Sequence, residues 1–150
     1  MSPETHTPQT APFRWENVPV LAYKEEGGTH FRHITRQVLF DDGDPAGSQV
    51  RYFEIAPGGH STLERHEHVH SVMVLRGRGQ ALVGRQIHAL AVNDLVRVPP
   101  RTWHQFRATA DEPLGFLCVV RSERDKPQRP TAGELAALRA DARVGPFVRA

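Results

Sequence analysis

The sequence predicts an all-β protein, built as a barrel or a sandwich, from two observations. Short runs rich in β-branched and aromatic residues recur along the chain, and residues that favour turns separate each run from the next. Many short strands at this spacing are typical of antiparallel barrels and sandwiches. A third observation limits the size. A chain of 150 residues is about one domain long, and a domain of that length can bury a core.

The expected strands follow one another through the middle of the chain. Gly, Pro and Asp end most of them, and these residues either supply unusual backbone angles or remove a hydrogen-bond donor from the ladder. The predicted strands are 18–23, 34–40, 49–55, 70–75, 80–83, 87–92, 95–98, 104–108 and 114–120.

The two ends of the chain depart from this pattern. The first twelve residues are rich in Pro and Thr and carry almost no core-forming side chains, so we expect a flexible lead. Thr131 and Glu134 form a capping box, which predicts one short helix near 132–142. We therefore divide the chain into a lead of 1–12, a barrel of 13–121 and a tail of 122–150.

Composition and charge exclude several classes of protein. The net charge is only +2 and no run of like charges is present, so nothing indicates a nucleic-acid partner. The single cysteine, Cys118, cannot form an internal disulfide, which suits a reducing compartment. No apolar run reaches the roughly 18 residues that span a bilayer, and the first residues do not resemble a signal peptide. We expect a cytoplasmic protein with no membrane partner.

A histidine-rich segment, residues 60–70, allows two interpretations. Residues 66–70 read His-Glu-His-Val-His, which fits the H-E-x-x-H signature of zinc proteases if the segment is a helix. The same letters fit H-x-H-x-H, which places every second side chain on one face of a strand. The β-branched residues that follow, and glycines on both sides, favour the strand. The residues expected on its one face are Glu64, His66, His68 and His70.

The spacing of this segment resembles the first motif of the cupin family, G-x5-H-x-H-x3-E-x6-G. A glutamate stands in the slot of the first histidine, and a histidine stands in the slot of the glutamate. A second stretch, residues 93–104, resembles the second cupin motif through its two prolines and its final histidine, although the motif's glycine and terminal asparagine are absent. The resemblance covers about residues 50–120. The positions that match the first motif are Gly58, Glu64, His66, His70 and Gly77.

The resemblance implies a double-stranded β-helix, or jelly-roll, barrel with extra N-terminal strands and a metal ion inside. Three imidazoles and one carboxylate suit a divalent Mn, Fe, Ni, Co or Zn ion, with one ion expected per chain. His68 has no slot in the motif, so it either orients a ligand or replaces one. We expect Trp103, Phe106 and Cys118 to line the pocket. The implied metal ligands are Glu64, His66, His70 and His104.

Four protein ligands would leave two positions open on a six-coordinate metal, which favours chemistry over a purely structural role. Many cupins are dioxygenases, so the resemblance implies an oxidoreductase that uses O2 on a small organic substrate, with Glu64 or His68 moving a proton. A non-redox isomerase or lyase is a second hypothesis, and a non-catalytic metal- or ligand-binding protein is a third. The apolar runs within residues 13–40 lead us to expect a homodimer in which they pack against the partner's sheet.

Overall fold

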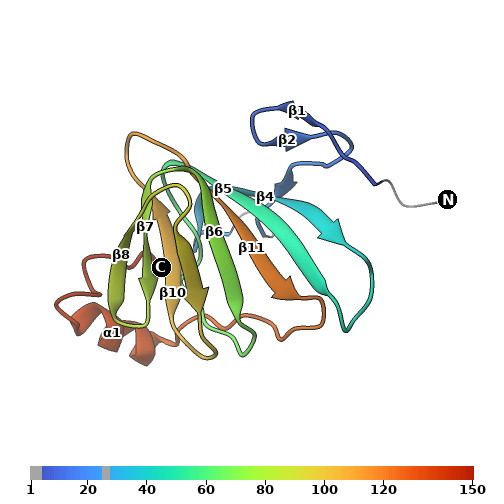
Figure 1. Ribbon diagram of the computed structural model, residues 1–150. Helices are drawn as coiled ribbons and strands as arrows, with labels where there is room; N and C mark the ends of the chain where they lie inside the picture. The colour runs from blue at the N-terminus through green and yellow to red at the C-terminus, as the bar shows by residue number, and fades with distance from the viewer. Residues whose placement is uncertain (1–4, 25–27) are drawn as a thin grey trace.

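An antiparallel sheet curls around the core of the protein, and a short helix lies beside it (Figure 1). The computed structural model describes residues 5–24 and 28–150. Within these residues it confirms the predicted all-β class. The elements are β1 (Gln9–Ala11), β2 (Arg14–Trp15), β3 (Leu21–Ala22), β4 (Arg32–Asp41), β5 (Ser48–His60), β6 (His70–Gly77), β7 (Gly79–Val83), β8 (Gln86–Leu90), β9 (Leu95–Val98), β10 (His104–Ala108), β11 (Leu114–Arg121) and α1 (Ala132–Ala140).

Strand β5 joins the two halves of the sheet. Along the described chain, the strand order is β8-β7-β10-β5-β11-β6-β9, with β4 on β5 and β3 on β4. The first part of β5 pairs with β11 and β4, and its last residue, His60, pairs with β10. Between these parts Gly58 adopts a φ of +77°, which an L side chain rarely tolerates. This bend carries the strand across the corner of the barrel.

The N-terminal region is more ordered than the sequence predicts. Residues 1–4 of the expected flexible lead lie outside the described residues, but Gln9–Ala11 pair with β2 in a two-stranded hairpin. Phe13 and Trp15 pack on the ring of Tyr52, at centroid distances of 5.3 and 5.6 Å. The expected strand 18–23 shortens to β3, because Pro19 has no N–H for a sheet ladder.

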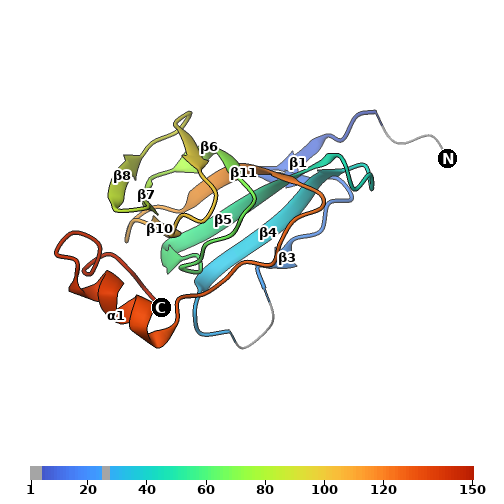
Figure 2. The ribbon, with the colours of Figure 1, turned by 90° about the horizontal axis from the view of Figure 1, so that it is seen from below.

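Two apolar clusters form on opposite sides of the curled sheet. The larger cluster fills the inside of the barrel with residues such as Phe53, Phe106 and Phe116. The smaller one lies under α1, where Leu135 and Leu138 of the helix pack against buried residues of the barrel and of the C-terminal segment. Figure 2 shows α1 outside the barrel, next to one end of the sheet. The C-terminal helix thus covers its own barrel.

The segment between β11 and α1 runs along one end of the sheet (Figures 1 and 2). It is fixed there by a backbone bridge between Arg65 and Gln128.

In the part of the chain that the structure describes, no helix is both long and apolar enough to cross a bilayer.

Candidate metal centre

Within the histidine-rich segment, residues 61–69 form a loop between β5, which ends at His60, and β6, which begins at His70. It is not a helix, so the zinc-protease interpretation is excluded. The expected strand is also wrong for His66 and His68, since β6 begins only at His70. Glu64 exchanges two backbone hydrogen bonds with His104, at 3.0 and 3.2 Å, and the chain then turns away from the sheet.

Asp125, which follows β11, gives this loop its shape. Its carboxylate accepts hydrogen bonds from the backbone N–H groups of Glu67 (2.9 Å) and His68 (3.1 Å), and from Nδ1 of His68 (2.8 Å). Partial burial raises the pKa of Asp125, but these three donors outweigh it and lower that pKa to about 2. The charged carboxylate of Asp125 therefore accepts the hydrogen bonds of the Glu67 and His68 backbone N–H groups, which a paired strand would satisfy through its neighbour.

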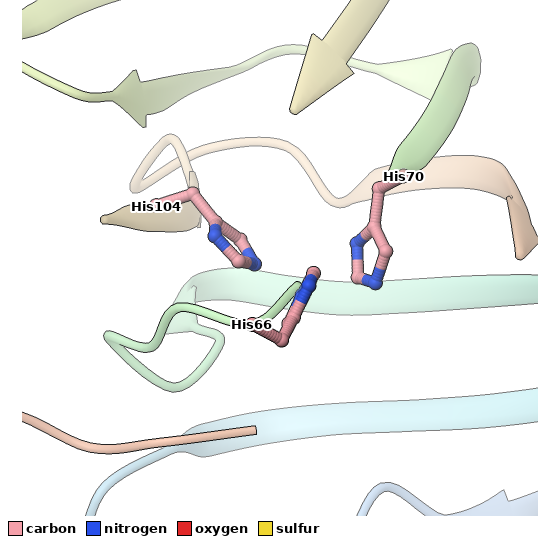
Figure 3. A group of neighbouring side chains, drawn as sticks. All are labelled: His66, His70 and His104. Carbon is pink, nitrogen blue, oxygen red and sulfur yellow. The ribbon is translucent and has the colours of Figure 1, made fainter. Parts of the chain in front are cut away.

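Three histidines, two of them four residues apart and the third on a distant strand, meet inside the barrel. His66 comes from the loop, His70 from the start of β6 and His104 from the start of β10, and their rings converge in Figure 3. One nitrogen from each ring lies within 4.8 Å of the other two. His66 and His104 are each only 2% exposed. This convergence is the geometry that a metal ion with imidazole ligands requires.

Hydrogen bonds set the tautomer of two of these rings. Nδ1 of His66 lies 2.7 Å from the carbonyl oxygen of His68, and Nδ1 of His104 lies 2.9 Å from that of Thr102. A carbonyl can only accept, so Nδ1 carries the proton and Nε2 keeps its lone pair. Within residues 5–24 and 28–150, neither Nε2 atom has a hydrogen-bond partner, although both are buried. Two unpartnered lone pairs beside a third imidazole fit a metal ion.

The three rings are neutral at physiological pH. Burial lowers the pKa of His66 to about 4, and the neighbouring His104 and His68 add to the effect. Burial also lowers the pKa of His104, and it places that of His70 well below the usual value. Metal ions bind the neutral imidazole, so these shifts leave the ligands ready without the loss of a proton.

Glu64 lies in the same cavity, but its carboxylate has another partner. Its Oε2 accepts a hydrogen bond from Nζ of Lys24 at 2.5 Å, and its side chain is 7% exposed. The group of ligand atoms within 4.8 Å of one another contains the three histidines and does not include Glu64. Its role as a ligand, or as the group that moves a proton, stays a prediction.

His68 lies beside the three histidines. Its ring stacks on that of His66 with centroids 3.7 Å apart and planes 5° apart. Asp125 holds Nδ1, so Nε2 faces the site, 3.3 Å from Nε2 of His70. Both roles predicted for His68, orienting a ligand or replacing one, agree with this position and remain open.

A cavity of about 270 Å³ opens beside the histidines. Phe106 and Cys118 line it, as predicted, together with Phe53 and Phe116. Trp103 does not line it, and that prediction was wrong. Trp103 comes just before β10 and packs in the cluster under α1, whereas His104, the first residue of β10, points inward. Burial raises the pKa of the Cys118 thiol.

Sequence reasoning missed several charged residues at this site. Lys24 and Asp125 are far in the chain from the groups that they contact, and no local pattern signals such pairs. Arg36 and Arg51 could have been found, because each occupies an inward position of an alternating strand, next to Ile34 or Phe53. A charged residue at a core position indicates a ligand or a buried partner. Arg124 also lines the cavity.

Comparison with known proteins identifies the family. Residues 51–120 match the model of the cupin domain family. A protein of Rhodospirillum rubrum named 1-methylthio-D-xylulose 5-phosphate methylsulfurylase is 59% identical over 141 residues, which are 94% of this chain and 90% of that protein.

Two crystal structures resemble the whole chain. A cupin 2 conserved barrel domain protein from Rhodopseudomonas palustris is 53% identical, with a TM-score of 0.91 over 97% of this chain and 100% of that chain. A cupin-2 domain protein from Rhodospirillum rubrum is 57% identical, with a TM-score of 0.83 over 95% of this chain and 94% of that chain. They confirm the predicted double-stranded β-helix barrel with one short helix. The chain belongs to the cupin family.

Proposed function

We propose that this protein is a metal-dependent enzyme that removes the methylthio group from a 1-methylthio ketose phosphate. The observation that carries the proposal is the pair of buried, unpartnered Nε2 atoms of His66 and His104, next to His70 in the wall of a cavity. The relative named for 1-methylthio-D-xylulose 5-phosphate supports this choice of substrate, at 59% identity. His66, His70 and His104 would hold one divalent transition metal per chain. Such a metal is a Lewis acid and would polarise the carbonyl group of the ketose.

The chemistry of the substrate decides how the sulfur leaves. A 2-ketose carries its carbonyl next to C1, so negative charge at C1 is stabilised and positive charge is not. The C1–S bond therefore breaks with its electrons remaining on C1. The methylthio sulfur forms a new S–S bond to an acceptor thiol, and C1 gains the proton that the thiol loses. Glu64 and His68, both in the cavity wall, are the groups that we propose deliver this proton.

An O2-dependent dioxygenase stays the competing prediction, and a non-redox isomerase or lyase and a non-catalytic binding protein follow it. The reaction proposed above needs a thiol and no oxygen. Turnover under anaerobic conditions therefore separates it from the dioxygenase, and the products separate it from an isomerase.

The test begins with protein made without a polyhistidine tag and loaded in turn with Mn, Fe, Co, Ni or Zn. Elemental analysis should give about one metal per chain. Anaerobic incubation with 1-methylthio-D-xylulose 5-phosphate and a thiol should give the 1-deoxy ketose phosphate and a mixed methyl disulfide, both measured by mass spectrometry. The His104→Ala variant is the control and should give neither product. Consumption of O2 with no mixed disulfide would favour the dioxygenase instead.

We also propose that the protein is a homodimer joined through residues 13–40. Phe40 on β4 is 69% exposed and Val20 is 44% exposed, so this region presents apolar side chains at the edge of the sheet. Light scattering at micromolar concentration should give twice the mass of the chain. A stable monomer would contradict the proposal.

A further inference from the structure

The cavity holds a second group of charged side chains, apart from the histidines. Arg36, Arg51 and Arg124 line it from three different segments. Among residues 5–24 and 28–150, none of the three has a carboxylate within the 4.0 Å of an ion pair. Lys24, the other cation of the cavity wall, is paired with Glu64. None of the three is therefore neutralised by a contact ion pair in the described protein, although the charge of Asp41 acts on Arg124 from a greater distance.

Arg51 has the least favourable surroundings of the three. Its Nε atom is buried and has no hydrogen-bond partner within the described part of the chain. Its Nη2 reaches only the thiol of Cys118, at 3.7 Å, and its guanidinium lies over the ring of Phe53. By contrast, Arg76 on β6 donates to both oxygens of Glu54, at 3.1 and 3.2 Å. The guanidinium of Arg51, partly buried and without a carboxylate partner, therefore favours an anionic ligand.

Arg124 extends the group towards solvent. It is held in place by hydrogen bonds to the carbonyl oxygens of Arg121 and Ser122 and to Oε1 of Gln49. Burial lowers its pKa, and the positive charges of Arg51 and then Arg36 lower it further. The guanidinium groups of Arg51 and Arg36 therefore repel that of Arg124, and Cys118 and Asp41 offset part of this repulsion. An anion between them would relieve that repulsion.

The arginines line the same cavity as His70 and His104. Strand β11 lies between β5, which carries Arg51, and β6, which begins at His70. Two strand spacings separate these backbones by about 10 Å. Phe53 and Phe116 line the cavity as well, and they offer an apolar surface. A single ligand in this cavity can therefore contact His70 and His104 at one part of the wall and the arginines at another.

We propose that Arg36, Arg51 and Arg124 form a phosphate subsite, which binds the terminal phosphate of a sugar phosphate whose other end lies at His66, His70 and His104. This inference rests on the proposed function, since it takes the same substrate class and the same cavity. The charge count favours a phosphate dianion over a carboxylate, because three cations face the ligand. Planar guanidinium groups also match phosphate oxygens with pairs of hydrogen bonds.

Two sugars that differ only in the phosphate test the subsite by calorimetry on the metal-loaded protein. D-xylulose 5-phosphate carries the phosphate and lacks the methylthio group, and D-xylulose lacks both. Arg51→Met and Arg124→Met should each weaken the binding of D-xylulose 5-phosphate by about 10- to 100-fold, the loss of one or more charged hydrogen bonds. Neither variant should change the affinity for D-xylulose. Arg97→Met is the matched control, since Arg97 is exposed on β9 outside this cavity, and it should change neither affinity.

Arg124 is on the surface, so its variant keeps the test valid if Arg51→Met does not fold. Equal affinity of the wild-type protein for the two sugars would overturn the proposal, and so would full retention of phosphate binding by both variants. Loss of the phosphate preference in His104→Ala alone would show that the phosphate binds the metal, which also overturns it. The outcome is independent of turnover. If the protein binds the phosphate through Arg51 but does not convert the methylthio compound, the phosphate subsite is supported and the proposed function is contradicted.

Discussion

His104 and Gln105 are neighbours on β10, and both are almost completely buried, yet their polar atoms are treated in opposite ways. Gln105 points away from the barrel interior. Its Nε2 donates to the carbonyl oxygens of Ser61 (2.8 Å) and Arg149 (2.6 Å), and its Oε1 accepts from N–H of Arg149 (2.9 Å). His104 points inward, and its Nε2 has no partner in the described chain.

The difference distinguishes two uses of a buried polar residue. Gln105 ties the C-terminal segment to the barrel, and all its strong hydrogen-bonding atoms are satisfied within the protein, as stability requires. His104 has one satisfied nitrogen, which fixes the ring, and one nitrogen left for something outside the chain. A buried atom without a partner costs stability, and such a cost is expected where a ligand binds.

The largest effect should come from His104→Ala. It removes one of three converging imidazoles, so metal affinity should fall by more than the roughly 10- to 100-fold that loss of a supporting partner costs. Elemental analysis after dialysis measures it. The free energy of unfolding of the metal-free protein should change far less than it does in Gln105→Ala. A His104→Ala variant that keeps its full metal content would contradict the assignment of His104 as a ligand.

Gln105→Ala should do the reverse. It loses three hydrogen bonds, and at about 1 kcal/mol each the free energy of unfolding should fall by about 3 kcal/mol in urea titrations. Metal content should stay at that of the wild-type protein. If metal is lost while stability is kept, the two faces of β10 do not divide their roles in this way.

Glu64→Gln tests whether the carboxylate of Glu64 binds the metal, as proposed for Nε2 of His104, or is satisfied within the protein, as the side chain of Gln105 is. If Glu64 is a ligand, metal affinity should fall by about 10- to 100-fold. Glu67→Gln is the matched control, because Glu67 is exposed and its carboxylate lies 3.6 Å from Arg101. Equal effects of the two variants would assign Glu64 to its ion pair with Lys24 alone.

The last comparison concerns pH and the metal-free protein. His66 in the folded chain keeps its ring neutral until the pH falls to about 4, whereas in the unfolded chain it takes up a proton near 6.5. The unfolded state thus binds more protons between these values, so the free energy of unfolding should decrease as the pH falls from 6.5 to 4. Urea titrations at several pH values should show a shallower decrease for His66→Gln. An unchanged slope would contradict a buried, neutral His66.

Much of the fold was predictable because it depends on local signals. Gly, Pro and Asp mark the ends of most strands, and the capping box of Thr131 and Glu134 marks α1, where both of its hydrogen bonds form. The expected division of the chain into lead, barrel and tail stays a prediction. The error at residues 9–11 has a tertiary cause, since that hairpin depends on the distant Tyr52.

The candidate site was predictable only in part. Motif spacing pointed to His66, His70 and His104, and the structure brings these three together. Periodicity then misled, because a loop held by Asp125 can present His66 and His68 on one side without a strand. Contacts between residues about 40 or more positions apart, such as Lys24 with Glu64 or Asp125 with His68, leave no local trace in one sequence.

The loop held by Asp125 also bears on how this barrel could be transplanted. The stretch that matches the family model ends at residue 120, five positions before the carboxylate that shapes the histidine loop. Lys24 lies outside the matched stretch on the other side. A graft cut at the family boundaries would carry His66, His70 and His104 and leave behind the two charged residues that hold their surroundings. The smallest portable form of this site is therefore longer than the domain by which it is recognised.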